Sequence, residues 1–152
     1  MTSAKLNRYH RIYTQAEQLT QSIPSPISRM ATISALLHHK MSGFFWTGFY
    51  LLHEGELLVG PYQGPLACLK LKTNTGVCWA GVHAAATVIV ADVHQFPGHI
   101  ACSSLSQSEI VVPIFDSTRQ VIGVLDIDSR DLNHFDEDDR LGLEKLVELI
   151  YS

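Results

Sequence analysis

Residues 44–60 read Phe-Phe-Trp-Thr-Gly-Phe-Tyr-Leu-Leu-His-Glu-Gly-Glu-Leu-Leu-Val-Gly. Seven of the first ten of these residues are aromatic or aliphatic, as in a β-strand that is buried on at least one face. Glu54-Gly55 then supplies a turn, and a second apolar run begins at Leu57. The stretch therefore predicts a β-hairpin, which begins an antiparallel sheet.

Two helices are predicted ahead of the hairpin. Residues 3–22 repeat apolar side chains at three- and four-residue spacing, and Pro24 stops this pattern. Ser25 followed by Pro26 is a helix-capping pair, and it begins a second helix that runs to about Met41. The apolar residues expected to face inward are Leu6, Tyr9, Tyr13, Ala16, Leu19, Ile23, Ile27, Met30, Ile33, Leu36 and Leu37. The two helices either add to the core or form a homodimer contact.

The part of the chain after the hairpin alternates short strands with two helices. These further elements are strands at 67–71, 88–91, 109–115 and 121–128 and helices at 77–86 and 136–151. Because hairpins and short links outnumber crossovers between parallel strands, the order indicates an α+β domain. We expect a central, mainly antiparallel, six-stranded sheet that is flanked by helices.

Length and composition limit the class of protein. A chain of 152 residues with 46% hydrophobic and 17% charged residues predicts one globular domain over residues 1–152. Within it we expect two N-terminal helices at 3–41, a sheet and loop at 44–128, and a C-terminal helix at 136–151. The net charge of −4 and the scattered Lys and Arg residues argue against nucleic-acid binding. The absence of a signal region or membrane span predicts a cytoplasmic, reducing location, where cysteines rarely form structural disulfides.

Residues 92–113 hold the densest set of reactive side chains. They read Asp-Val-His-Gln-Phe-Pro-Gly-His-Ile-Ala-Cys-Ser-Ser-Leu-Ser-Gln-Ser-Glu-Ile-Val-Val-Pro. A connection of this length between strands is usually functional or disordered. Its apolar residues favour an ordered loop that packs on the domain, and they are Val93, Phe96, Ile100, Ala101 and Leu105. The rest of the chain is therefore expected to hold this loop over the sheet.

The cysteines of the chain allow three interpretations. A free cysteine such as Cys102 is often only a small buried apolar residue. Together with Cys68 or Cys78, however, it could form a redox pair. Zinc binding by the three cysteines with His94 and His99 is the third interpretation, and it is disfavoured because the chain lacks the close cysteine pair of structural zinc sites. We therefore expect no metal.

Two acidic residues lie near the end of an apolar strand. Asp126 and Asp128 are two residues apart, so their side chains point to the same face of the sheet. They are either solvated carboxylates at a strand end or carboxylates directed at whatever covers the sheet. The second interpretation is favoured, because Leu125 and Ile127 would then share the opposite face.

Several motifs together resemble those of a known family. They are Gly-Pro-Tyr-Gln-Gly-Pro-Leu-Ala-Cys at 60–68, Thr-Gly-Val-Cys at 75–78, Asp-Val-His-x-Phe-x-Gly-His-Ile-Ala-Cys at 92–102, Ser-Glu-Ile-Val-Val-Pro at 108–113 and Ile-Gly-Val-Leu-Asp-Ile-Asp-Ser at 122–129. In this order and spacing they are similar to those of the free methionine-(R)-sulfoxide reductases, a catalytic branch of the GAF-domain fold. The resemblance covers nearly the whole chain, and the predicted order of elements also fits a GAF-like domain.

The resemblance implies a role for each cysteine. Cys102 would be the nucleophile, Cys68 the main resolving thiol, and Cys78 a second cysteine able to join disulfide exchange. The chain departs from the family pattern at Trp79, where a small residue usually follows the Gly-Val-Cys sequence. This departure changes the surroundings of Cys78, so the share of the resolving role between Cys68 and Cys78 stays open.

The resemblance also implies a substrate pocket. Glu109, Asp126 and Asp128 would form its acidic part, and Trp46 and Tyr50 would line the side that receives the methyl group. This composition suits the chemistry, because a sulfoxide is a poor electrophile until its oxygen is protonated or strongly hydrogen-bonded. Crowded carboxyl groups raise one another's pKa and keep a proton available for that step.

The activity implied by the resemblance is the reduction of free L-methionine-(R)-S-oxide to methionine, a role in oxidative stress. The reaction would pass through a cysteine sulfenic acid and an intramolecular disulfide. Thioredoxin or a similar dithiol would be the reductant, and no other cofactor is expected. The alternative function is a non-catalytic GAF sensor for a small ligand; the absence of an attached effector domain argues against it.

Overall fold

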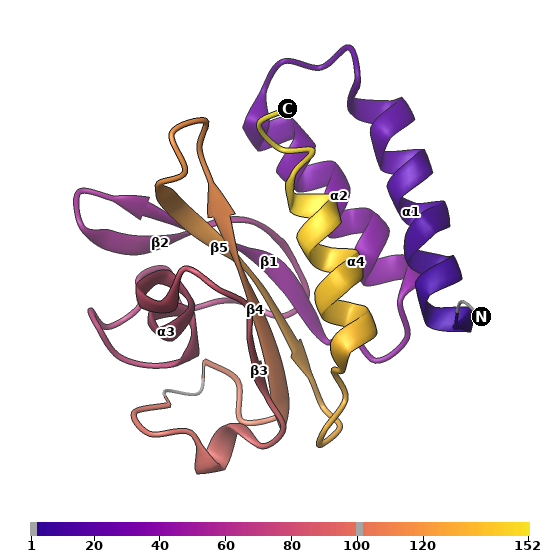
Figure 1. Ribbon diagram of the computed structural model, residues 1–152. Coiled ribbons are helices and arrows are strands. Elements are labelled where there is room, and N and C mark those ends of the chain that lie inside the picture. Colours follow the sequence, from indigo (N-terminus) through magenta and orange to yellow (C-terminus); the bar gives the residue numbers. More distant parts are fainter. Residues whose placement is uncertain (1–2, 100–101) are drawn as a thin grey trace.

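The computed structural model describes residues 3–99 and 102–152. Its centre is a five-stranded sheet in which neighbouring strands are all antiparallel (Figure 1). The strands, in their order across the sheet, are β2 (Glu56–Gln63), β1 (Trp46–His53), β5 (Val121–Ser129), β4 (Ser108–Phe115) and β3 (Val88–Val90). This arrangement confirms the α+β class and the hairpin predicted at residues 44–60.

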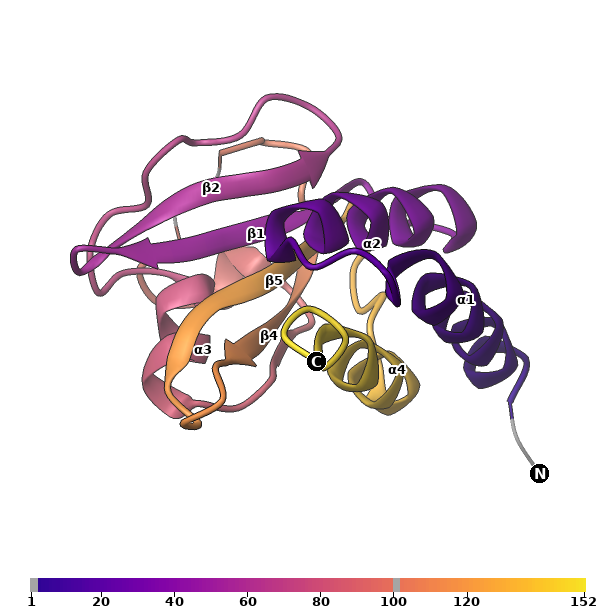
Figure 2. The ribbon, with the colours of Figure 1, turned by 90° about the horizontal axis from the view of Figure 1, so that it is seen from above.

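Three helices form a layer on one face of the sheet. They are α1 (Ala4–Thr20), α2 (Pro26–Lys40) and α4 (Glu137–Val147). Seen from above, α2 and α4 lie close to the sheet and α1 lies outermost (Figure 2). The side chains of Ser3, Ser25 and Asp136 cap their N-termini, which confirms the cap predicted at Ser25. The first two helices thus add to the core.

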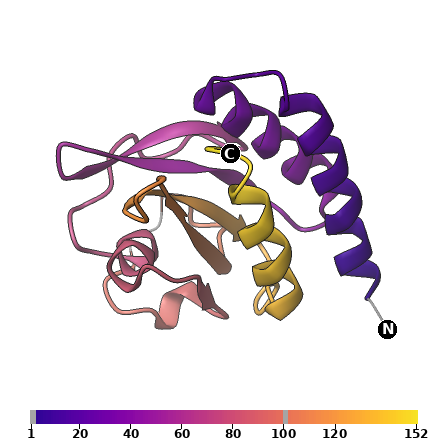
Figure 3. The ribbon, with the colours of Figure 1, turned by 45° about the horizontal axis from the view of Figure 1, so that its top comes forward.

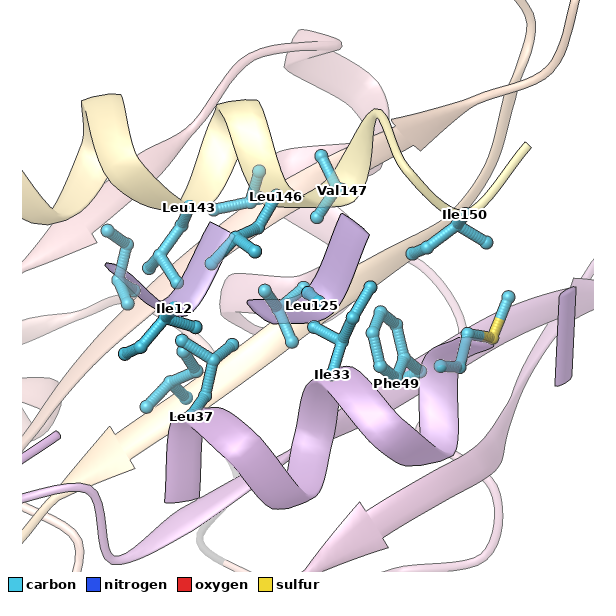
Figure 4. Packing of buried hydrophobic residues seen from close by; sticks show 14 of the residues in the cluster. Ile12, Ile33, Leu37, Phe49, Leu125, Leu143, Leu146, Val147 and Ile150 are labelled. Carbon is cyan, nitrogen blue, oxygen red and sulfur yellow. The ribbon is translucent and has the colours of Figure 1, made fainter. Parts of the chain in front are cut away.

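The main core lies between this helical layer and the sheet. The alternation of β1 and β5 directs Phe49 and Leu125 to the helices, where they meet Ile33 of α2 and Leu146 of α4 (Figure 4). These four side chains are fully buried. Burial of such residues stabilises the domain by about 1.5–3 kcal/mol per side chain, so this layer is the rigid support for the other face of the sheet.

The predicted inward face of the first two helices is wrong in part. Leu19, Ile23 and Ile27 are exposed, with 52% of Leu19 and 53% of Ile27 accessible to solvent. Leu19 is exposed because α1 packs mainly on α2 and α4, so only a narrow stripe of α1 is covered. That stripe includes Ile12, which was not among the residues expected to face inward.

The expectation of a sixth strand at residues 67–71 is also wrong. One isolated bridge joins Lys70 to Leu58 of β2, with a backbone hydrogen bond on either side of it. The bridge does not continue as a strand, and the Cys68 carbonyl oxygen accepts a hydrogen bond from the Tyr50 hydroxyl at 2.8 Å. The leucines on either side of Cys68 are left exposed, Leu66 by 87% and Leu69 by 75%.

The last helix is shorter than the predicted range of 136–151. It ends at Val147, and a tighter turn follows in which the N–H groups of Leu149 and Ile150 donate to carbonyls three residues earlier. The buried Arg29 side chain donates to the Leu149 carbonyl oxygen at 2.6 Å. Arg29 thereby satisfies a carbonyl that the end of the helix leaves without a partner.

The opposite face of the sheet is covered by α3 (Val77–Ala84), the 3₁₀ turn η1 (Val93–Gln95) and the loop around them (Figure 3). Val93 is buried and Phe96 is partly buried, as expected for an ordered loop, whereas Leu105 is exposed. The predictions for Ile100 and Ala101 lie outside the described residues. Among the described helices, none has the length and apolar character needed to span a membrane.

Candidate active site

The register of three strands gathers the predicted pocket residues on one face. Glu109 of β4 pairs with Asp128 of β5, and Asp128 also pairs with Trp46 of β1. Directly paired residues share a face of an antiparallel sheet, as do residues two apart along a strand. Asp126 and Tyr50 therefore join the other three. This face is the one that α3 and the loop cover (Figure 1).

A cavity of about 100 Å³ lies between this face and the covering loops. All eight side chains that the sequence proposes as site residues line it: Trp46, Tyr50, Cys68, Cys78, Cys102, Glu109, Asp126 and Asp128. Asp126 is only 5% exposed, which rules out the solvated interpretation of that carboxylate. His99 and Ser106 also line the cavity, although neither was proposed as a pocket residue.

Two of the three cysteines form a disulfide. Cys68 and Cys102 are 34 residues apart in sequence and their sulfur atoms are bonded. Cys78, at the start of α3, is free and buried. The disulfide joins the long loop to the segment beside β2, and the cavity lies next to it. A bond between these two cysteines is consistent with the resemblance, which implies that Cys102 is the nucleophile and Cys68 the main resolving thiol.

The zinc site considered from the sequence is not assembled. Two of its cysteines are bonded to each other, and His94 points to Asp92, with its Nδ1 atom 3.1 Å from a carboxylate oxygen. The His94 side chain is exposed to solvent and Asp92 is partly exposed. Cys68 and Cys102 are therefore joined to each other instead of binding one ion together with Cys78.

The acidic residues have unusual proton affinities. Burial raises the pKa of Glu109 and of Asp128 well above the ordinary carboxyl range, and the negative charge of Asp126 adds to both shifts. Burial also raises the pKa of Asp126, but the neighbouring Glu109, Cys78 and Asp128 groups, which can donate hydrogen bonds to the ionised carboxylate, oppose that rise. The pocket therefore has its negative charge centred on Asp126, beside two carboxyl groups that favour their protonated forms.

Cys78 is held as a neutral thiol. Burial raises its pKa well above the ordinary thiol value, and the nearby charges of Asp126 and Glu109 act in the same direction. Since the thiolate is the nucleophilic form of cysteine, these surroundings disfavour attack by Cys78.

Trp46 and Tyr50, which line the cavity, belong to an aromatic stack. The Trp46 ring lies parallel to Tyr50 at 5.7 Å and to Tyr62 at 5.2 Å between ring centres. Trp46 also donates its indole N–H to the Pro65 carbonyl oxygen at 3.1 Å. Tyr62 was not identified from the sequence, although it lies within the quoted 60–68 motif, because nothing in that motif indicates a strand that would direct its ring to Trp46.

We predict that Gly48→Ala disrupts this aromatic stack. A Cβ atom at Gly48 would lie 2.2 Å from the Tyr62 Cβ and 2.8 Å from the Trp46 ring. Overpacking of this kind costs about 1–3 kcal/mol, so urea denaturation should show that loss for Gly48→Ala. Gly60→Ala is the matched control, because its Cβ would meet the flexible end of Leu51 at 3.2 Å. Equal stability of the two variants would contradict the prediction.

The chain is similar to known proteins over most of its length. No protein-family model matches the chain. The free methionine-R-sulfoxide reductase of Escherichia coli K12 is 43% identical over 121 residues, which cover 80% of this chain and 73% of that protein. The GAF domain-containing protein A of Dictyostelium discoideum is 43% identical over 148 residues, covering 97% of this chain and 92% of that protein. The solved structure of the free methionine-R-sulfoxide reductase of Neisseria meningitidis in complex with its substrate is 41% identical, covers 99% of this chain and 90% of its own, and matches with a TM-score of 0.91.

Proposed function

The chain belongs to the family of free methionine-R-sulfoxide reductases, and from that premise we propose that it reduces free L-methionine-(R)-S-oxide to methionine, with Cys102 as the nucleophile. The observation that carries this proposal is the disulfide between Cys68 and Cys102 beside the acidic cavity. A disulfide in this place is the product expected once the sulfoxide oxygen has been removed.

The reaction has three balanced steps. The Cys102 thiol attacks the sulfoxide sulfur, the S–O bond of the substrate breaks, and methionine leaves; the oxygen and the thiol proton remain on Cys102 as a sulfenic acid. The Cys68 thiol then attacks the sulfenic acid, which forms the disulfide and releases water. An external dithiol finally gives two electrons and two protons to the disulfide and becomes a disulfide itself. This step restores both thiols.

The acidic groups activate the sulfoxide. Glu109 and Asp128 favour their protonated forms, so either can donate a proton or a strong hydrogen bond to the sulfoxide oxygen. The charge on Asp126 suits the α-ammonium group of a free amino acid. The stacked rings of Trp46 and Tyr50 offer an apolar surface for the S-methyl group.

A thiol count tests the proposed function. The chain has three cysteines, so the fully reduced protein should show three thiols. One equivalent of L-methionine-(R)-S-oxide should leave a single thiol, Cys78, and release one methionine. Methionine sulfone is the control, because it resembles the substrate but is not reduced by this chemistry. A count that stays at three after incubation with the sulfoxide would favour the alternative of a non-catalytic GAF sensor.

The reductant of this cycle is proposed to be a thioredoxin-type protein of a cytosolic, reducing compartment. Leu66 and Leu69 are highly exposed and lie on either side of Cys68 in the sequence. Cys102, on the other side of the disulfide, is also exposed. A protein dithiol has to place its attacking sulfur against this disulfide, and the two leucines offer an apolar contact beside it.

We predict that the double substitution Leu66→Ser and Leu69→Ser slows reduction of the disulfide by thioredoxin by about tenfold or more. The reason is that a loss of about 1.4 kcal/mol of contact energy corresponds to a factor of ten. Reduction by dithiothreitol, which needs no docking surface, should keep its rate. Leu132→Ser is the matched control, because Leu132 is 58% exposed and does not line the cavity. A similar loss with both reductants would show that the leucines act on the disulfide itself.

A further inference from the structure

The third cysteine takes no part in the three steps above, yet it lies among charged groups. The Cys78 sulfur, a carboxylate oxygen of Glu109 and a carboxylate oxygen of Asp126 all lie within 4.8 Å of one another. They come from α3, β4 and β5, and each residue is only 5% exposed. The backbone of three separate elements therefore holds a thiol and two carboxyl groups together on the buried side of the cavity.

One atom of this group lacks a partner. Asp126 Oδ1 is buried and, within the described part of the chain, accepts no hydrogen bond. An unsatisfied buried acceptor costs about 1–3 kcal/mol, and more when it is charged. Asp126 lines the cavity, so a ligand in the cavity with positive charge would satisfy this atom.

We propose that Cys78, Glu109 and Asp126 form a binding site for a thiophilic divalent cation of the Zn²⁺ and Cd²⁺ class. The bound ion takes the position proposed for the substrate ammonium group and inhibits the enzyme reversibly. The ion-binding part of this inference rests on the geometry of the three residues, whereas the inhibition rests also on the proposed function.

The donor set determines which ions bind. Zn²⁺ forms bonds of about 2.3 Å to cysteine sulfur and about 2.0–2.2 Å to carboxylate oxygen, so its tetrahedral ligands lie roughly 3.3–3.7 Å apart. The three side chains can reach that spacing with small rotations from their present separation. A sulfur donor favours Zn²⁺ and Cd²⁺ over Mg²⁺ and Ca²⁺, which prefer oxygen ligands only. The fourth position is left to water, and the protons displaced from the ligands pass to solvent.

The disulfide form of the protein gives a clean test, because Cys78 is then its only free thiol. Cd²⁺ added to this form should produce the ultraviolet charge-transfer absorption of a cadmium–thiolate bond and saturate at one ion per chain. Zn²⁺ should remove the absorption by displacement, and Mg²⁺ in excess should leave it unchanged. Native mass spectrometry of the unmodified protein should count one Cd²⁺.

Variants identify the ligands. Cys78→Ser should abolish the absorption, and Asp126→Asn or Glu109→Gln, which keep the thiol, should each weaken Cd²⁺ binding by about tenfold or more, the equivalent of about 1.4 kcal/mol. Absorption that persists in Cys78→Ser would overturn the inference. The inference would also be overturned if the unmodified protein showed neither the absorption nor a bound Cd²⁺ ion. This second result does not depend on whether the variants fold.

Kinetics then separate this inference from the proposed function. Zn²⁺ should raise the KM for methionine sulfoxide and leave kcat unchanged, and a chelator should reverse the effect. If Cd²⁺ binds through Cys78 but the protein reduces no sulfoxide, the ion site stands and the proposed function fails. If Zn²⁺ inhibits turnover while the disulfide form binds no Cd²⁺, the inference fails and the proposed function stands.

Discussion

Cys102→Ser is expected to abolish reduction of methionine sulfoxide, both in a single turnover and in a cycle driven by thioredoxin. A serine hydroxyl cannot accept the sulfoxide oxygen as a sulfenic acid, and burial raises the pKa of Cys78 well above the ordinary thiol value, which makes it a poor replacement. The measurement is methionine release per protein, followed with the resolved R epimer. Multiple turnovers by Cys102→Ser would show that another group is the nucleophile.

The other two cysteines provide the matched controls. Cys68→Ser should release one methionine per protein and then stall, with a sulfenic acid at Cys102 that dimedone traps as a mass increase. Cys78→Ser should have the mildest effect, because the structure shows the disulfide between the other two cysteines. If Cys78→Ser stalls as Cys68→Ser does, the resolving role is shared between them.

The sequence predicts best those elements of the fold in which apolar and polar residues alternate regularly. The alternation from Leu125 to Asp128 correctly indicates a strand with apolar side chains on one face and carboxylates on the other. The pattern at 67–71 is equally regular, but it forms no strand. A side-chain hydrogen bond from Tyr50 and a covalent bond to Cys102 hold Cys68 there, and neither constraint is visible in local periodicity.

The residues of the site also differ in how far the sequence predicts them. Residues two apart in one strand can be placed on one face from the sequence alone, and this spacing places Asp126 and Asp128 together. The position of Glu109 opposite Asp128 depends on the register of β4 against β5, which the turn between them sets. Tyr62 was missed for the same reason, because its contact with Trp46 depends on how β2 pairs with β1.

N-acetylation of the substrate is expected to lower kcat/KM by about a thousandfold. The N-acetyl compound keeps the sulfoxide but loses the ammonium charge, so the buried charge centred on Asp126 would remain without a cation. Leaving a buried charge unpaired costs about 3–5 kcal/mol, and every 1.36 kcal/mol is a factor of ten in rate. A sulfoxide within a polypeptide lacks that charge as well, and its flanking chain would have to pass between the loops that cover the cavity. The enzyme should therefore act on the free amino acid.

Two controls separate the charge of the substrate from its size. The methyl ester of methionine sulfoxide keeps the ammonium group while it enlarges the other end of the molecule, so it should lose much less activity than the N-acetyl compound. Asp126→Asn removes the partner of the ammonium group, and it should narrow the difference between the free and the N-acetyl substrate. Thioredoxin-coupled turnover measures all of these combinations. If the free and N-acetyl substrates react at comparable rates with the unmodified enzyme, the charge of Asp126 does not select the substrate, even if Cys102 proves to be the nucleophile.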